Sequence, residues 1–253
     1  MNADRTLLTD AQWARLAPLL PGQAHSPGVT AKDTRLFVEA ILWRLRCGVP
    51  WRDLPERFGP WHRVFVRFSR WKHSGVWAKA LAALQDETGL SQLQVDSTIV
   101  RAHQHAAGAL KKKGPQALGR SRGGFSTKLH LSCDAQGRPR QLALTGGQAG
   151  DCPHAPALLV ADLRAGQHVL ADRAYDANYL REQITQAGAQ AVIPSKKNRK
   201  VPIAHDAQVY KNRNQIERCF NRLKAYRAIA NRFEKTALAY LALVTLAAIR
   251  MWL

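Results

Sequence analysis

The sequence predicts an α/β protein in which a mixed sheet flanked by helices follows a small all-α N-terminal domain. Up to residue 72, apolar residues recur at the three- and four-residue spacing of helices. From residue 93, short runs rich in β-branched residues alternate with helical patterns, as in α/β domains. The chain has 253 residues, 46% of them hydrophobic, which is enough for packed cores. We therefore expect a helical domain over 1–90 and an α/β domain over 91–253.

The helices of the N-terminal domain are predicted from their apolar stripes and their start and stop residues. The expected spans are Thr9 to Leu20, ended by Pro21; Lys32 to Cys47, ended by Gly48; and Trp61 to Lys72. Short turns are expected between the second and third helices, ending at Gly59. Short helices, a glycine turn and a further helix resemble a helix-turn-helix.

The third predicted helix carries a row of arginines on the side away from its apolar stripe. Arg63, Arg67 and Arg70 recur at four- and three-residue spacing. In a helix-turn-helix such a helix enters the major groove, so these arginines are candidates for DNA contact. The alternative is a small helical bundle with a solvated basic face.

The elements of the second domain follow the order strand, hairpin, helix, strand, helix, strand, helix. The expected strands are 93–101, 125–132, 140–145, 169–172 and 189–195, and the expected intervening helices are 153–163 and 173–188. This order matches a ribonuclease H-like domain. A buried helix is expected over 237–249, which is too short before Arg250 to cross a bilayer.

A last predicted helix, over 210–224, has charged residues along one side and apolar residues along the next. At about 100° per residue, one sector holds the four polar residues. They are Tyr210, Arg213, Glu217 and Lys224. Taken alone, this pattern describes an amphipathic surface helix with an i,i+4 ion pair between Arg213 and Glu217.

Three acidic residues stand where they could form one site. Asp96 lies within a predicted strand, Asp172 ends another, and Glu217 lies on the last helix. A carboxylate in mid-strand either faces solvent or is aimed at a metal or substrate. If the strands are neighbours and the helix crosses them, the three carboxylates converge. Such an oxygen-rich site suits Mg²⁺ or Mn²⁺, and a pair of ions there can catalyse phosphoryl transfer.

The remaining charge is strongly positive, with 38 Lys and Arg against 18 Asp and Glu and a net charge of +20. This excess is typical of nucleic-acid-binding proteins. Two basic segments are candidates for contact with DNA phosphates. Their residues are Lys111, Lys112, Lys113, Arg120, Arg122 and Lys128 in the first and Lys196 and Lys197 in the second.

Neither histidines nor cysteines form a metal-binding pattern. His103 and His105 are two residues apart without a third nitrogen or sulfur ligand nearby, so they are expected to face phosphates or solvent. The four cysteines are scattered, as in a reduced intracellular protein. The N-terminal residues lack the apolar segment of a signal peptide, and we expect a cytoplasmic, nucleoid-associated protein.

The 210–224 stretch resembles the Tyr-Arg-Glu-Lys signature of bacterial insertion-sequence DDE transposases, the group that includes the insertion-sequence-four and insertion-sequence-five families. VDSTIV around Asp96 and LADRAYD around Asp172 are similar to the two aspartate motifs of the insertion-sequence-five group. GRSRGGFSTKLH, WRDLPERFG and RFSRW are similar to further segments of that group. Ala174 stands where many relatives have Gly.

The resemblance implies a catalytic and metal-binding triad of Asp96, Asp172 and Glu217, with Tyr210, Arg213 and Lys224 contacting DNA. It implies a transposase that binds terminal inverted repeats, cleaves them with Mg²⁺ or Mn²⁺, and joins them to target DNA. Since two ends must meet, at least a homodimer on double-stranded DNA is expected. The alternatives are a non-catalytic DNA-binding protein and a two-metal nuclease without a joining step.

Overall fold

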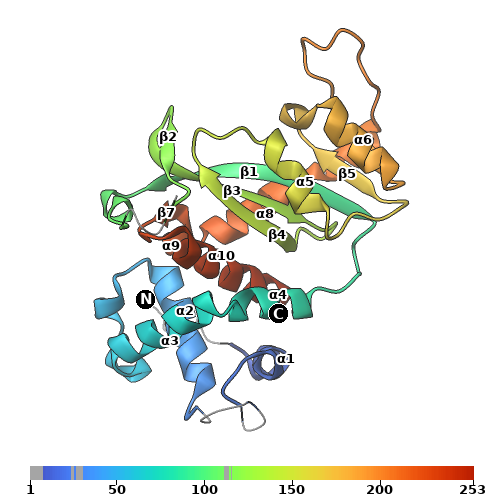
Figure 1. The fold of residues 1–253 in the computed structure, drawn as a ribbon. Helices are drawn as coiled ribbons and strands as arrows, with labels where there is room; N and C mark the ends of the chain where they lie inside the picture. Colours follow the sequence, from blue (N-terminus) through green and yellow to red (C-terminus); the bar gives the residue numbers. More distant parts are fainter. Residues whose placement is uncertain (1–7, 24–25, 27–30, 111–113, 115) are drawn as a thin grey trace. The chain divides into compact units, whose positions relative to one another are not determined.

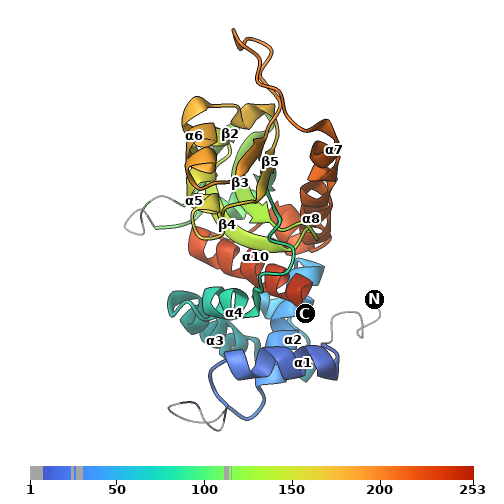
Figure 2. The same cartoon turned by 90° about the vertical axis from the view of Figure 1, so that its right-hand side faces the viewer.

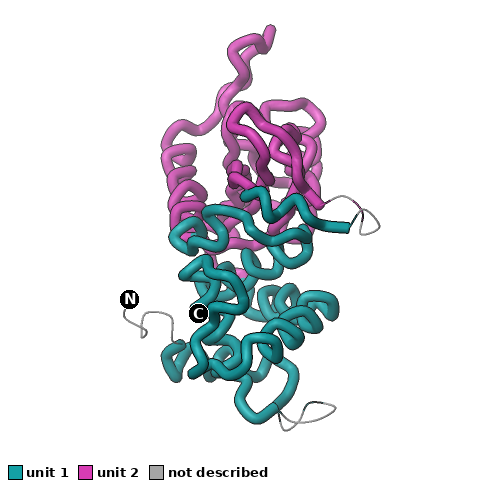
Figure 3. Tube along the Cα trace, turned by 90° about the vertical axis from the view of Figure 1, so that its left-hand side faces the viewer, with its two compact units in different colours: residues 1–86, 103–113, 223–253 teal, residues 87–102, 114–222 magenta. Residues whose placement is uncertain are grey.

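The computed structural model describes residues 8–23, 26, 31–110, 114 and 116–253. The chain forms two compact units, coloured separately in Figure 3. Unit 1 comprises residues 1–86, 103–113 and 223–253, and unit 2 comprises residues 87–102 and 114–222. No helix among the described residues is both long and apolar enough to cross a membrane.

This division differs from the boundary expected near residue 90, because 103–113 and 223–253 group with the N-terminal helices. The C-terminal helix α10 (Ala237–Trp252) gives the physical reason. Every residue from Ala242 to Ile249 is buried, and α10 contacts other helices of unit 1. A helix that is apolar all round needs partners on several sides. The sequence predicted its burial but not which core it joins.

Unit 1 is helical, as predicted, and its first three helices lie close to the expected spans. Its helices are α1 (Asp10–Leu16), α2 (Thr34–Cys47), α3 (Trp61–His73), α4 (Val76–Leu84), α9 (Arg227–Ala230) and α10, and it also contains the short strand β7 (Asn231–Arg232). Thr9 caps α1 in a capping box with Gln12. Asp33 caps α2 through a 2.7 Å bond to Leu36 N. Gly48 ends α2 with φ 71°, a conformation that favours glycine.

The helix-turn-helix stays a prediction, because the connection before α3 is long. Two 3₁₀ turns, Trp51–Asp53 and Glu56–Phe58, separate α2 from α3, whereas a helix-turn-helix joins its helices by a three- to four-residue turn. The tight turn follows α3 instead, where Gly75 begins α4 with φ 70°. The helix α4 was not predicted.

Unit 2 is built on a mixed sheet with the order β2-β3-β1-β5-β6, in which β4 also pairs with β3. The strands are β1 (Gln92–Ala102), β2 (Gly119–Ser121), β3 (Gly124–Cys133), β4 (Pro139–Gly146), β5 (His168–Ala171) and β6 (Gln190–Val192). The β1–β3 and β3–β4 pairs are antiparallel, and the β1–β5 and β5–β6 pairs are parallel. The predicted hairpin and the predicted order of elements along the chain are therefore confirmed, and β2 is additional.

Helices lie on both faces of this sheet, as Figure 2 shows with the sheet edge-on between α5 and α6 on one side and α8 on the other. The helices of unit 2 are α5 (Ala155–Leu159), α6 (Asn178–Gln186), α7 (Ala207–Tyr210) and α8 (Asn214–Lys224), which runs to the edge of the unit. The first face holds an apolar core to which β1 contributes Leu93 and Val95. Since side chains alternate along a strand, Gln94 and Asp96 project to the α8 face.

Candidate active site

Asp96 and Asp172 occupy equivalent places on neighbouring parallel strands. Val95 of β1 is paired with Ala171 of β5, and each aspartate is the next residue of its chain. Because paired strands are about 4.8 Å apart, the two carboxylates leave the sheet side by side. Figure 1 shows β1 and β5 together in the sheet, with α8 across it. Asp172 also accepts a 2.8 Å hydrogen bond from Ala174 N, which orients its carboxylate.

The helix α8 carries Glu217 on the same face of the sheet as Asp96, and Arg213 links the two carboxylates. Arg213 donates from Nη2 to Asp96 Oδ2 at 2.6 Å and from Nη1 to Glu217 Oε1 at 2.8 Å. The i,i+4 pair predicted on the helix therefore exists, but its guanidinium also spans to β1. The carboxylates of Asp96 and Glu217 thus share the Arg213 guanidinium, and Asp172 lies beside Asp96.

The sequence predicted one continuous α-helix over 210–224, but the structure divides this segment. It begins in α7, passes through a 3₁₀ turn at Lys211–Arg213 and continues as α8. The buried side chain of Gln94 explains the break. Its Nε2 donates to Asn212 O and its Oε1 accepts from Ile216 N, both at 3.1 Å. The amide thus takes the place of a backbone bond between residues four apart, which interrupts the helix.

The same bonds make Gln94 a clamp between the strand of Asp96 and the helix of Glu217. Asn212 and Ile216 are the immediate neighbours of Arg213 and Glu217 in sequence. Gln94 is fully buried, so both of its amide atoms need partners and its geometry is fixed. Sequence reasoning missed this residue, although a Gln between the apolar Leu93 and Val95 was the available signal.

Asp96 is the carboxylate most perturbed by its surroundings. Burial raises the pKa of Asp96 to about 6, against the opposing effect of Arg213 and the hydrogen bond from Ser97 N. The nearby Asp172 and Asp151 raise this pKa further. Asp96 is therefore a buried carboxylate that needs a cation at neutral pH, and Arg213 is the cation the chain itself provides.

The donor set suits a divalent metal, although the side chains are not gathered around one point. The three carboxylates are hard oxygen donors, as Mg²⁺ and Mn²⁺ prefer. The burial of Asp96 disfavours its negative charge, a cost that a cation would relieve. In the part of the chain that the structure describes, no three His, Cys, Asp or Glu side chains are close enough to hold an ion. Arg213 bonds both Asp96 and Glu217 in this arrangement.

A second polar cluster involves Ser97, the residue after Asp96. Ser97 Oγ donates to Asp151 Oδ1 at 2.6 Å, and Lys128 Nζ donates to the same oxygen at 2.7 Å. Lys128 also donates to Ala149 O at 2.6 Å. These bonds hold Asp151 and lower its pKa, although its burial acts in the opposite direction. Asp151 was missed in the sequence, where it ends the glycine-rich GGQAGD loop.

Lys128 was predicted to contact DNA, but the structure buries it in this cluster. Its side chain is 11% exposed and is paired with Asp151. Since two acceptors already hold its ammonium group, Lys128 is placed to support the site rather than to meet phosphates at the surface.

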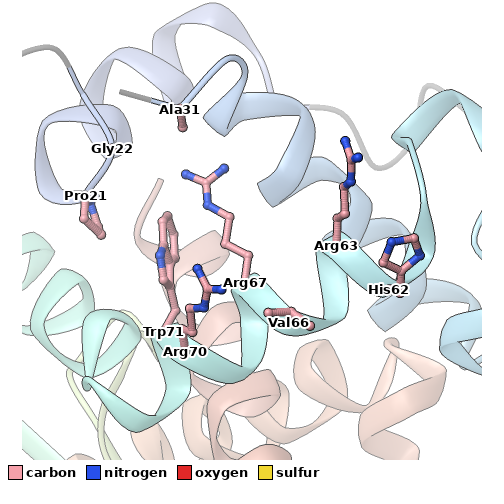
Figure 4. A pocket seen from close by; sticks show the side chains of 9 residues that line it. All are labelled: Pro21, Gly22, Ala31, His62, Arg63, Val66, Arg67, Arg70 and Trp71. Atoms are coloured by element: carbon pink, nitrogen blue, oxygen red, sulfur yellow. The ribbon is translucent and has the colours of Figure 1, made fainter. Parts of the chain in front are cut away.

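The arginine row of α3 divides into two exposed residues and one packed residue. Arg63, Arg67 and Arg70 line one pocket of about 570 Å³, shown in Figure 4. Arg63 and Arg70 are exposed. Arg67 donates to Thr34 Oγ1 at 2.8 Å and lies over the rings of Phe37 and Trp71. Burial lowers the pKa of Arg67.

The other predicted DNA contacts are scattered over loops and helix ends. Arg120, Arg122 and Lys197 are exposed, and Lys196 is partly exposed. Tyr210 ends α7 beside His205, with 5.3 Å between ring centroids. Burial raises the pKa of Tyr210, Arg213 lowers it, and Asp172 raises it. Lys224 ends α8, and burial lowers its pKa. Lys111, Lys112 and Lys113 lie outside the described residues.

Two family models match this chain and identify its family. Residues 87–252, which include Asp96, Asp172 and Glu217, match the family model described as "Transposase DDE domain". The chain belongs to the DDE transposases of the IS4/5 type. Residues 8–81 of the transposase match a second model, described as "Putative transposase of IS4/5 family". The first residue of the DDE model's match, residue 87, follows the last residue of the second model's match, residue 81. The family match does not favour a non-catalytic DNA-binding protein.

Two relatives are similar to parts of this chain. The transposase is 45% identical over 130 residues to a putative transposase for insertion sequence element IS6501 of Brucella ovis, covering 51% of this chain and 99% of the relative. It is 48% identical over 107 residues to an uncharacterized protein, y4sN, of Sinorhizobium fredii, covering 42% and 86%. The fold is similar to that of piggyBac transposase in a synaptic complex with hairpin DNA, with a TM-score of 0.53 and 10% identity over 98% of this chain and 73% of that one. The ribonuclease H-like fold is thereby confirmed.

Proposed function

We propose that the transposase binds the terminal inverted repeats of its insertion sequence, hydrolyses the phosphodiester at the element's ends and joins the freed 3′-hydroxyls to target DNA. One observation carries this proposal. Asp96 lies on β1, Asp172 directly follows the parallel neighbour β5, and Arg213 bonds both Asp96 and Glu217. Three carboxylates from distant parts of the chain thus share one side of the sheet.

Asp96, Asp172 and Glu217 would hold the divalent ions, Mg²⁺ or Mn²⁺, of which we expect two. Bound ions supply positive charge at the scissile phosphate and make the attacking oxygen more acidic. The chain's own groups prepare the site. Gln94 fixes the helix of Glu217 on the strand of Asp96, and Arg213 neutralises the acids that would otherwise repel DNA.

The exposed basic residues would hold the DNA. Arg63 and Arg70 of α3 are proposed to contact the inverted repeat, and Arg120, Arg122 and Lys197 to contact phosphates. Tyr210 and Lys224 flank Glu217 in sequence and are proposed to contact the strand at the cleavage point. Because two ends must be joined in one reaction, the active form is proposed to be a homodimer on DNA.

The test uses Asp172→Asn and Glu217→Gln, which keep side-chain shape and remove charge. Both variants should bind inverted-repeat DNA like the unaltered protein and lose cleavage and strand transfer by about 10³-fold or more, a loss typical of an essential catalytic group. Glu182→Gln, on the exposed side of α6, is the control and should retain activity. Cleavage that survives in both variants would refute the assignment. A precleaved end that is not joined would indicate a nuclease instead.

A further inference from the structure

Unit 1 contains a second pocket, which the proposed reaction does not use. Its volume is about 570 Å³, within the roughly 300–1,000 Å³ range of pockets that bind small molecules. Its walls come from the end of α2, from α3, from the turn at 103–105 and from the residues before α10. The pocket lies wholly within unit 1.

Aromatic rings form much of the lining. Trp51 contacts Phe65 and Phe68, with ring centroids 5.6 and 5.1 Å apart. Phe233 and His103 form another pair, at 4.9 Å. Phe65 remains 39% exposed, which leaves a ring face open to a planar ligand. Planar aromatic surfaces at a pocket mouth favour stacking by a nucleobase.

The lining also carries more positive than negative charge. Among the described residues of the pocket, Arg44, Lys72 and Lys235 stand against the single carboxylate of Glu234. Glu234 forms an ion pair with Arg44, with 2.7 Å between Oε1 and Nη2. The Arg44 Nε and Nη1 atoms are buried without an acceptor among the described residues. The side chain of Arg44 is 6% exposed and lies over Trp51 at 4.2 Å.

The exposed Lys235 and His105 complete the lining at its surface. His105 lies against His103, with 4.4 Å between ring centroids. A ligand that fits here has a flat apolar body and a negative group. We propose that this pocket binds a single unstacked nucleotide of a DNA strand, with its base against Phe65 and Trp51 and its phosphate near Lys235 and His105.

The proposal explains why an apolar pocket and a cationic rim occur together. A duplex keeps its bases stacked inside, so only an unpaired or extruded nucleotide can enter a pocket of this size. Stacking of one base on an aromatic side chain is worth about 1–3 kcal/mol, and the cations add a salt-dependent attraction for the phosphate. The inference rests on the proposed function only for the source of unpaired nucleotides, which would come from the opening of DNA ends that strand cleavage leaves.

The experiment measures binding of a fluorescein-labelled single-stranded oligothymidylate to the full chain by anisotropy. Phe65→Ala and Lys235→Glu should each weaken this binding by about tenfold, as expected for the loss of one stacked base or its phosphate contact. The matched controls are Leu238→Ala, another exposed apolar residue of unit 1, and Lys79→Glu, another exposed lysine. Both controls should bind like the unaltered protein. Thymidine 5′-monophosphate should compete for the site, and inorganic phosphate alone should not.

Three results would overturn the inference. The pocket variants could bind the oligonucleotide as well as the controls do. Phosphate alone could compete as well as the nucleotide, which would indicate a bare anion site. Duplex affinity could fall as much as single-strand affinity, which would indicate a general cationic surface. Glu217→Gln separates this inference from the proposed function, because it should abolish cleavage and leave oligothymidylate binding intact.

Discussion

Arg213 and Asp96 are 117 residues apart in the chain and are joined by a 2.6 Å bond between Nη2 and Oδ2. Each side chain is 17% exposed, so the pair is largely shielded from water. The arginine signature of the helix and the first aspartate motif are therefore parts of one electrostatic unit. Asp96 keeps its negative charge at neutral pH because Arg213 is there, even though burial raises the pKa of Asp96 to about 6.

Replacing Arg213 by Gln should destabilise the protein by about 2–3 kcal/mol near neutral pH, because a largely buried carboxylate loses its cation. The loss should shrink as the pH falls toward about 6 and be absent below it, since without Arg213 the pKa of Asp96 is higher still and the protonated group needs no cation. Urea unfolding at several pH values measures both effects. Arg218→Gln, at an exposed position of the same helix, should change little. A destabilisation that does not vary with pH would contradict this account.

Gln94→Leu should lower the rate of cleavage by about 10–100-fold, because a shift of about 1 Å in a catalytic group has an effect of that size. Without the amide, Asn212 and Ile216 are free to form their own backbone bond, and α8 changes register against β1. Single-turnover kinetics should show a lower rate constant with unchanged affinity for repeat DNA. The control is Gln190→Leu, an exposed glutamine of β6. A wild-type rate in Gln94→Leu would show that the clamp is dispensable.

His130 should make the stability of the protein depend on pH. Burial lowers the pKa of His130 to about 4, with His154 and Lys128 acting in the same direction and Asp151 opposing them. The folded state thus binds this proton less well than the unfolded chain, whose histidine titrates near 6.5. The stability is fully present above about pH 6.5 and is lost as the pH falls toward 4.

Between about pH 7 and pH 5 the loss from His130 alone amounts to about 2 kcal/mol. His130→Leu removes the titrating group, so its unfolding free energy should vary less over this range. Its Nε2 bond to Thr145 Oγ1 is lost at every pH and lowers the whole curve. The exposed His62→Leu serves as the comparison. Parallel pH curves for unaltered protein and His130→Leu would rule out this histidine as the cause.

Replacing Lys128 by Met should affect stability, whereas replacing Lys197 by Met should affect DNA binding. Lys128→Met leaves Asp151 without its cation and should cost about 1–3 kcal/mol of stability with little change in DNA affinity. Lys197→Met should leave stability unchanged and reduce the salt dependence of DNA binding by about one phosphate contact. The double variant Lys128→Met with Asp151→Asn should be less destabilised than the two single effects predict. A large loss of DNA affinity in Lys128→Met would show that this lysine contacts DNA.

On α3, replacing Arg67 should likewise affect stability, whereas replacing Arg70 should affect DNA binding. Arg67→Met removes the bond to Thr34 and the contacts with Phe37 and Trp71, and it should destabilise unit 1 by about 1–2 kcal/mol. Arg70→Met should weaken DNA binding and its salt dependence without destabilising the fold. Thermal melting and a salt titration of DNA affinity separate the two outcomes. Equal losses of DNA affinity would mean that the row acts as one surface.

Local pattern determined much of this fold. The helices of residues 9–72 followed from apolar spacing, the start at Thr9 and the stops at Pro21 and Gly48, all of which act within a few residues. The strands around Asp96 and Asp172 followed from β-branched runs. The three carboxylates were identified because their motifs resemble those of a family.

Only the tertiary structure decided what depends on residues far apart in the chain. The sequence did not indicate that Gln94 would interrupt the 210–224 helix, because its partners lie more than a hundred residues away. Nor did periodicity distinguish Lys128 or Arg67, which are packed, from Lys197 or Arg70, which are exposed. Sequence spacing specifies the direction of a side chain on its own helix or strand, whereas burial and charge pairing depend on which other elements pack against that side.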